Sequence, residues 1–277
     1  MAADFSLFTS LRYDPELRQV PSKDIQFAGW NHHNESPLYM LDLHRDRLLR
    51  AAVHWKWEKA IKKLSGQAGI KNLTKAAEDA AASAQHGPLR IRIVVTQQGE
   101  ISGESFNALP QDIVNLFPET FATPGSQPAV DQPQLPPRIN CVVDSHGSYR
   151  SEHTHFKTTK RAVYDDARSR AGIGAINPAD TTEVLIVNSE DDSVMEGSTT
   201  TPYFWQGGKW TTPPVSPRFS THDGSGGNDG TTRRWALERG LAVEEAIKID
   251  QLVEGEECYI SNGVSGFRAG VVHLRKT

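Results

Sequence analysis

Three polar stretches of the chain hold residues that could react with a ligand or bind one. Lys157 stands in HTHFKTTKRAVYDDAR and Glu196 in VMEGSTTTPYF, while the glycine-rich stretch Gly224–Gly230 runs into TTRRWALERG. A lysine amine becomes a nucleophile only in a site that lowers its pKa, so Lys157 taken alone is more simply a solvated charge. The Glu196 carboxylate can pair with a cationic ligand group, or it can bond to the backbone of its own turn.

The glycine-rich stretch Gly224–Gly230 could bind an anion. Glycines let the backbone curl, and the first N–H groups of a helix point outward and attract phosphate. No Gly-Lys-Ser/Thr step follows, so Gly224–Gly230 is not a P-loop, and a surface loop before a capped helix stays an alternative. The spacing His153-x-His155 is only a weak metal signal, and the pair His32 and His33 is weaker still. We therefore expect no metal site.

Alternating and periodic apolar residues predict the elements that must position these side chains. A stripe of Leu49, Val53, Trp57, Ala60 and Leu64 predicts one helix over His44–Leu64, with Gly66 as its stop. Further helices are expected at Lys157–Ala171 and at Thr231–Arg239, which Gly240 ends. Strands are expected at Phe5–Tyr13, Leu89–Thr96, Ile139–Val143, Glu183–Val187, Tyr203–Trp205, Lys209–Thr211 and Glu257–Ser261. The fold class is therefore mixed, α+β or α/β.

Composition and length narrow the class of protein. The chain has 277 residues, enough for two domains, and its net charge of −4 argues against a nucleic-acid binder. No apolar run approaches the roughly 20 residues of a membrane span, and the N-terminus does not resemble a secretory signal. With two cysteines, a reducing cytoplasmic setting is expected. The Pro-rich stretch 118–138 predicts a linker between a smaller α+β domain, 1–117, and a larger domain, 139–277, to which the family resemblance given below assigns cofactor binding. A long surface loop inside one domain is the alternative.

Several motifs follow one another in an order that resembles a known family. They are His44-Arg45-Asp46-Arg47-Leu48, Lys157 in FKTTKRAVYDDAR, Glu196 in EVLIVNSEDDSVMEGS, the step Thr212-Pro213, the helix start Gly230-Thr231-Thr232-Arg233, and ISNGVSGF near the C-terminus. Together they resemble the fold-type IV pyridoxal-phosphate (PLP) enzymes, the class IV aminotransferase family. The resemblance runs from Phe8 to about Val272 and implies a two-domain fold like that of D-amino-acid aminotransferase.

The resemblance also implies roles for individual residues. Lys157 would form the internal aldimine with PLP and take the α-proton of an amino substrate. Glu196 would meet the pyridine nitrogen and keep the ring protonated, so that it withdraws electrons. Arg47, Thr231, Thr232, Gly263 and Val264 would hold the phosphate. Thr9, Arg12 and Arg92 are candidates for binding the substrate, because arginine binds carboxylates in a bidentate manner; for Arg92, an exposed charged face of its strand is the alternative. A homodimer is expected.

The choice of reaction within the family rests on smaller signals. The hydroxyl-rich segment FTSLRYDP and the stretch KTTKR…Y…AR resemble 4-amino-4-deoxychorismate lyase, the fungal type especially, which releases pyruvate and 4-aminobenzoate. A class IV transaminase for branched-chain amino acids, D-amino acids or (R)-amines is the alternative, and a non-catalytic binding relative is a third. Thr201 stands where the family commonly has Asn, Thr231 replaces an Ile, and the chain starts almost at the family's second strand. These departures are expected to affect specificity more than cofactor binding.

Overall fold

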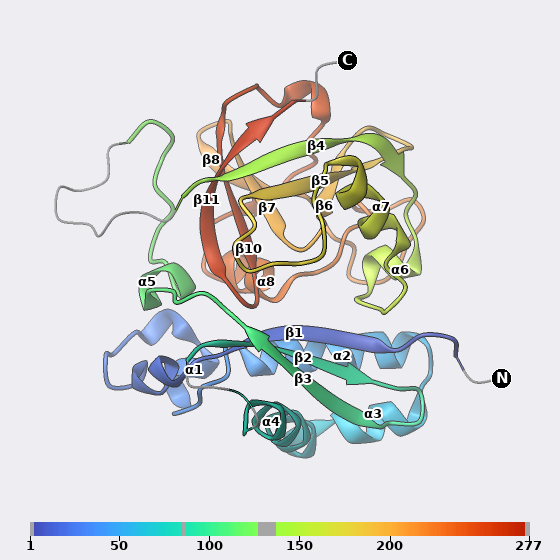
Figure 1. The fold of residues 1–277 in the computed structure, drawn as a ribbon. Coiled ribbons are helices and arrows are strands. Elements are labelled where there is room, and N and C mark those ends of the chain that lie inside the picture. Colours follow the sequence, from blue (N-terminus) through green and yellow to red (C-terminus); the bar gives the residue numbers. More distant parts are fainter. Residues whose placement is uncertain (1–2, 83, 85–86, 127–136, 275–277) are drawn as a thin grey trace. The chain divides into compact units, whose positions relative to one another are not determined.

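The computed structural model describes residues 3–82, 84, 87–126 and 137–274, which fold into two compact units (Figure 1). Unit 1 consists of 1–117, 156–160 and 263–265, and unit 2 of 118–155, 161–262 and 266–277. Two short segments from within the second half of the chain thus belong to the first unit, and one of them carries Lys157. Part of the predicted linker, 127–136, lies outside the described residues, so the linker stays a prediction.

Unit 1 is built on a three-stranded antiparallel sheet. The strands are β1 (Leu7–Tyr13), β2 (Leu89–Val95) and β3 (Ile101–Asn107), in the order β1-β2-β3. Burial alternates along β2, which follows from the alternation of side chains on a strand. Leu89 and Ile91 therefore face the core of the unit, while Arg90 and Arg92 share the other face.

Unit 1 also contains several helices. They are α1 (Trp30–His33), α2 (Leu41–His54), α3 (Glu58–Leu64), α4 (Gly66–Ala82) and α5 (Ile113–Leu116), with short 3-10 turns η1 (Pro15–Gln19) and η2 (Gln26–Ala28). Helix α2 packs on β1, and α4 packs on β2 and β3. Helix α4 comes so close to β3 that a Cβ on Gly103 would lie 2.4 Å from the carbonyl oxygen of Ala76. Small residues on both elements make this contact possible.

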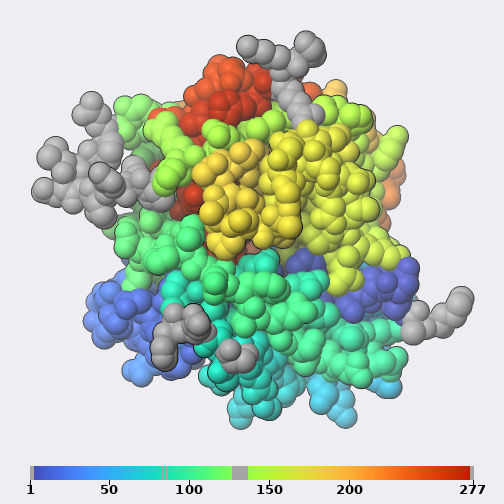
Figure 2. Space-filling view, in the orientation of Figure 1, coloured from blue at the N-terminus to red at the C-terminus, as the bar shows by residue number. Residues whose placement is uncertain are grey.

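Unit 2 is built on an eight-stranded mixed sheet in the order β6-β5-β4-β11-β10-β7-β8-β9. Its strands are β4 (Ile139–Ser148), β5 (Thr182–Asn188), β6 (Val194–Gly197), β7 (Thr201–Gln206), β8 (Lys209–Thr212), β9 (Val243–Glu244), β10 (Glu257–Asn262) and β11 (Gly266–His273). Its helices are α6 (Glu152–His155), α7 (Ala162–Arg170), α8 (Thr231–Glu238) and the 3-10 turn η3 (Ile249–Gln251). Figure 2 shows residues of α7 and of the segment that follows it, in yellow, gathered on one face of this unit.

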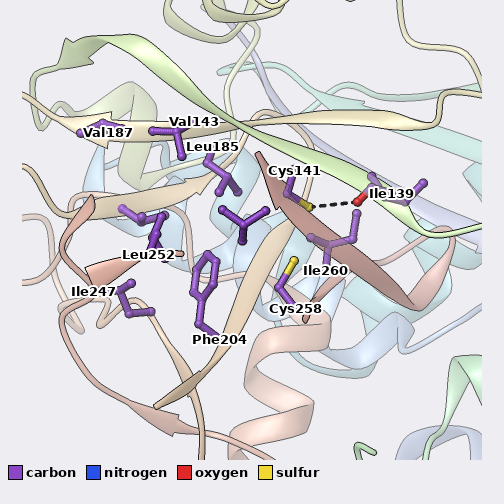
Figure 3. Close-up of a cluster of buried hydrophobic side chains, with 12 residues drawn as sticks. Ile139, Cys141, Val143, Leu185, Val187, Phe204, Ile247, Leu252, Cys258 and Ile260 are labelled. Atoms are coloured by element: carbon purple, nitrogen blue, oxygen red, sulfur yellow. Dashed lines mark hydrogen bonds between the residues drawn. The ribbon is translucent and has the colours of Figure 1, made fainter. Parts of the chain in front are cut away.

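The core of unit 2 is a cluster of buried side chains from several of its strands. Side chains from β4, β5, β7, β10 and β11 meet in one buried cluster (Figure 3). Cys141 and Cys258 are free thiols within it, and a Cβ on Gly270 would lie 2.9 Å from each sulfur. A hydrogen bond to Cys258, together with burial, raises the pKa of the Cys141 thiol. The two sulfurs therefore act as apolar packing atoms in this core.

The single helix expected over His44–Leu64 is wrong: the segment forms α2 and α3 with a break between them. Lys56 adopts the left-handed conformation, with φ at +54°, which ends the helical hydrogen-bond pattern. Trp55 and Trp57 on either side pack their rings on Phe5, at 5.0 and 5.2 Å between ring centroids. Val53 of the predicted apolar stripe is 53% exposed, and α2 buries Leu48, Ala51 and Ala52 instead. Tertiary packing of the tryptophans outweighs the helical periodicity.

The helix expected over Lys157–Ala171 is also wrong in its start, because α7 begins only at Ala162. Residues 157–159 pair instead with the start of β1. The Phe8 N–H donates to the carbonyl of Lys157 at 3.1 Å, and the Thr159 N–H donates to the carbonyl of Ser6 at 2.9 Å. These bonds take the place of helical ones, so Lys157 lies in the turn between α6 and α7.

The other expected elements are confirmed with shifted ends. Glu183–Val187 is the inner part of β5, and the hairpin at Gly207 and Gly208 joins β7 to β8, with both glycines at positive φ. Thr231–Arg239 corresponds to α8 and is followed by Gly240 at φ +68°. Helix α4 and strands β3 and β11 were not expected, and β4 is twice as long as the predicted strand. None of the helices in the described part of the chain is long and apolar enough to cross a bilayer.

Candidate active site

Lys157 in unit 1 is fixed by its backbone and lies on an aromatic ring. Its Nζ is 5.1 Å from the centroid of the Phe8 ring, on the strand that also bonds to its carbonyl. The guanidinium of Arg92 lies over the same ring at 5.0 Å and pairs with Glu104 at 3.0 Å. An aromatic face attracts both cations. Two of the predicted site residues, Lys157 and Arg92, thus both contact the ring of Phe8.

Arg47 and Thr9 form a second, buried part of unit 1 with His44. The Arg47 guanidinium donates to Thr9 Oγ1 at 2.5 Å, and Thr9 Oγ1 lies 2.7 Å from His44 Nδ1. Since arginine only donates, the Thr9 hydroxyl oxygen is the acceptor in its hydrogen bond with Arg47. Burial, with the nearby charges of Arg47 and Lys157, holds the pKa of His44 well below its usual value. His44 is therefore neutral at pH 7.

Gly263 and Val264 belong to this same part of unit 1, although they lie between β10 and β11 in the chain. A Cβ on Gly263 would lie 2.5 Å from Cε1 of His44, so only glycine fits there. The Gly263 carbonyl accepts from the N–H of Arg12 at 2.8 Å, and the Val264 carbonyl accepts from the Arg12 guanidinium at 3.3 Å. Arg12 is 1% exposed and pairs with Asp14 at 2.6 Å. Its charge is thus matched within the unit, which argues for a structural role and against a substrate-carboxylate clamp.

Glu196 lies in unit 2, on strand β6 and not in the turn that the sequence indicated. It is 9% exposed, and the Tyr164 hydroxyl donates to its Oε1 at 2.6 Å. Burial, followed by the negative charge of Glu196, raises the pKa of Tyr164 well above its usual value. Tyr164 therefore stays a protonated donor beside a buried carboxylate.

The turn after Glu196 is held by a second buried carboxylate, Glu183. One oxygen of Glu183 accepts from the N–H and the hydroxyl of Ser198, and the other accepts from Thr199 and from the Thr200 hydroxyl, at 2.5 to 3.2 Å. These donors satisfy both oxygens of the buried carboxylate and tie the turn 198–200 to the start of β5. The sequence interpretation missed both Glu183 and Tyr164. A charged residue opening the strand EVLIV was the available signal for Glu183.

Thr231 and Thr232 open helix α8 in unit 2, and both are buried. Thr232 Oγ1 lies 2.7 Å from Ser261 Oγ on β10. Gly230 is the N-cap, and among the described residues no side chain caps this helix start. A Cβ on Gly230 would lie 2.7 Å from Thr201 Oγ1, so a larger residue at the N-cap would clash with β7. Outward N–H groups at such a start suit an anion.

The glycine-rich stretch before α8 packs on β6. A Cβ on Gly227 would lie 2.4 Å from the Met195 carbonyl oxygen and 3.2 Å from the Cβ of Glu196. Ser225 and Asn228 are buried, and the Asn228 side-chain amide donates to the His155 carbonyl at 3.0 Å. The stretch thus backs the strand that carries Glu196 and is not a flexible surface loop. Within the described residues, no group of three or more His, Cys, Asp or Glu side chains could hold a metal ion.

Comparisons with known proteins bear on both units. A family model described as amino-transferase class IV matches residues 27–271. No curated protein sequence matches the chain. Among solved structures, a proposed amino-acid aminotransferase from Mesorhizobium loti is 18% identical with a TM-score of 0.63, and the match covers 98% of this chain and 100% of that one.

Two further solved structures carry different names. A proposed 4-amino-4-deoxychorismate lyase from Legionella pneumophila is 12% identical with a TM-score of 0.60, covering 98% of this chain and 83% of that one. The branched-chain amino acid aminotransferase of Escherichia coli is 15% identical with a TM-score of 0.57, covering 97% and 76%. At these identities the likeness concerns the fold, and it confirms the expected two-domain, fold-type IV class.

Proposed function

Because the chain belongs to the class IV aminotransferase family, we propose that it is a PLP-dependent enzyme that acts on an amino substrate through Lys157. Bound PLP supplies an electron-withdrawing ring that acidifies the α-carbon of the substrate. The observation that carries the proposal is Lys157 itself, an amine whose backbone is fixed by β1 and whose Nζ lies on the Phe8 ring. A positioned amine of this kind can bind an aldehyde and move a proton.

The donor groups of each unit fit parts of PLP. In unit 1, Lys157 suits the aldehyde, and the Arg47 guanidinium, held by Thr9, suits the phosphate. The backbone at Gly263 lies close to the cluster of Arg47, Thr9 and His44, because a Cβ there would clash with His44. In unit 2, the buried carboxylate of Glu196 suits a protonated pyridine nitrogen, and the N–H groups at the start of α8, at Thr231 and Thr232, suit phosphate oxygens.

Within the family, we propose 4-amino-4-deoxychorismate lyase activity. The hydroxyl-rich segment around Thr9 and the KTTKR stretch support it, and structures named as this lyase are among the similar folds. In this reaction Lys157 Nζ removes the α-proton, after which pyruvate leaves and the aromatic ring of 4-aminobenzoate forms. Aromatisation supplies the driving force, so no second substrate is needed.

A class IV transaminase is the second candidate, because aminotransferases are also among the similar structures. Incubation with 4-amino-4-deoxychorismate alone, followed by a pyruvate assay, separates the two. Pyruvate without any acceptor supports the lyase. Turnover only when an amino donor and a keto acid are both present would replace it with the transaminase. We also propose a homodimer, for which light scattering should give about twice the chain mass of 30.6 kDa.

A further inference from the structure

Tyr164 is an enclosed tyrosine with only one proton to give and two acceptors near its hydroxyl. Its Oη lies 2.6 Å from Glu196 Oε1 and 3.3 Å from the carbonyl oxygen of Thr154. The shorter distance and the charged acceptor favour Glu196, because hydrogen bonds to ionised groups are the stronger ones. The proton of Tyr164 is thus directed at the carboxylate.

The ring of Tyr164 is held so that this hydroxyl cannot turn away. It packs in a buried cluster with Val184, Ile186 and Met195, the last of which directly precedes Glu196. The guanidinium of Arg161 lies over the ring at 4.5 Å and donates to the Ser198 carbonyl at 2.8 Å. The Arg161–Ser198 hydrogen bond therefore ties the start of α7 to the turn after β6, beside the Tyr164–Glu196 bond.

This arrangement stabilises the ionised form of Glu196. A hydroxyl that donates to a carboxylate favours the anion, and in a buried place that excludes water such a bond is a strong one. Tyr164 also takes one of the two oxygens, which limits how the carboxylate can rotate. A fixed anion is what a protonated ring nitrogen needs as its partner.

We propose that Tyr164 is a positioning residue that keeps Glu196 ionised and oriented for the pyridine nitrogen of PLP. The inference rests on the proposed function, since it takes PLP to be the ligand. Without the hydroxyl, the proton shared between the ring nitrogen and Glu196 moves toward the carboxylate, and the charged contact is lost.

The test compares two ligands that differ only at the ring nitrogen. Cofactor-free protein is titrated with PLP and with its 1-deaza analogue, in which a carbon replaces that nitrogen. In wild type, PLP should bind more tightly. Tyr164→Phe should weaken PLP binding about tenfold and leave analogue binding within about twofold, because only the nitrogen contact depends on the hydroxyl.

A matched control is Tyr39→Phe in unit 1, which also removes a buried hydroxyl, one that donates to the Leu116 carbonyl. It should leave both affinities within about twofold of wild type. Glu196→Gln alone should make the affinities for PLP and for the analogue equal. Adding Tyr164→Phe to Glu196→Gln should not weaken PLP binding any further. If Tyr164→Phe does not fold, the ratio of the PLP affinity to the analogue affinity is measured in Tyr164→Met, which fills the space without a hydroxyl.

The outcomes separate the inference from its premise. If Tyr164→Phe lowers both affinities equally, or neither, Tyr164 only packs and the inference fails while the proposed function stands. If wild type binds PLP and the analogue equally, Glu196 does not meet the ring nitrogen, and the inference fails as well. If wild type binds neither ligand, the proposed function itself is wrong.

Discussion

Phe8 holds Lys157 in two ways at once. Its backbone N–H donates to the Lys157 carbonyl at 3.1 Å, and its ring lies 5.1 Å from Lys157 Nζ. A lysine on a mobile surface loop would have neither restraint. The pairing of 157–159 with β1 thus accounts for a lysine whose backbone is fixed in the turn ahead of α7.

Lys157→Ala should abolish both turnover and the visible absorbance that PLP gives with the protein, because the amine that binds the aldehyde is gone. The melting temperature should change by only a few degrees, since a half-buried side chain is removed and the backbone bonds remain. Absorbance and circular dichroism measure the two effects. Lys160→Ala, which removes an exposed lysine paired with Asp4, is the control and should behave as wild type. Full activity in Lys157→Ala would refute its catalytic role.

Glu196→Gln should retain PLP but slow removal of the substrate α-proton by about 10- to 100-fold, the effect of losing one charge-assisted hydrogen bond. The neutral amide keeps the shape of the side chain and cannot hold the ring nitrogen in its protonated form. Exchange of the substrate α-hydrogen with deuterated solvent measures the rate. An unchanged exchange rate would remove Glu196 from the ring-nitrogen role.

Arg47→Ala should weaken the binding of PLP by about 10- to 100-fold and leave the binding of pyridoxal, which has no phosphate, nearly unchanged. The guanidinium is buried and held by Thr9, so it is available as a fixed partner for the phosphate. Titration with the two ligands measures the ratio. Arg45→Ala, on the same helix and paired with Asp46, should leave the ratio as in wild type. Equal losses for both ligands would contradict a phosphate contact.

Glu183→Ala should lower the free energy of unfolding by about 3 kcal/mol, because several buried donors of the turn 198–200 lose their acceptor. The corresponding fall in melting temperature is roughly 5–10 °C. Calorimetry measures it. Glu245→Ala, which breaks an exposed pair with Lys209, should shift the melting temperature by no more than roughly 2 °C. Similar shifts in both variants would show that Glu183 does not hold the turn.

His44 should make the protein less stable as the pH falls below about 6.5. Burial lowers the pKa of His44 in the folded state, so the unfolded chain takes up a proton that the folded chain refuses. Its contribution is fully present above the unfolded pKa and is lost as the pH falls, at up to about 1.4 kcal/mol per pH unit. Denaturant titrations between pH 7 and 5 measure the slope. His44→Gln should reduce it by about one proton, and an identical slope would contradict a neutral buried His44.

The sequence predicts best those elements whose pattern matches their burial. The run EVLIV indicates a strand buried on both faces, and β5 indeed sends Leu185 to one core cluster and Ile186 to the other. The pair Gly207-Gly208 predicts a tight hairpin, which the structure confirms. In these cases local sequence and long-range packing favour the same conformation.

Prediction fails where distant segments decide. The break at Lys56 depends on Phe5 packing with the two tryptophans, and the late start of α7 depends on bonds to β1. Nothing near Tyr164 in the chain indicates that its partner is Glu196, because the contact spans 32 positions. The types of the site residues can be predicted from sequence motifs, whereas the side chains that fix them require the fold.

The most direct measurement of the central claim is the position of the lysine that binds PLP. The purified protein is incubated with PLP, reduced with borohydride, digested and analysed by mass spectrometry. Our account predicts one stable pyridoxyl adduct, on the peptide that contains Lys157, and none in Lys157→Ala. An adduct on another lysine of the wild-type chain, or no adduct at all, would contradict it.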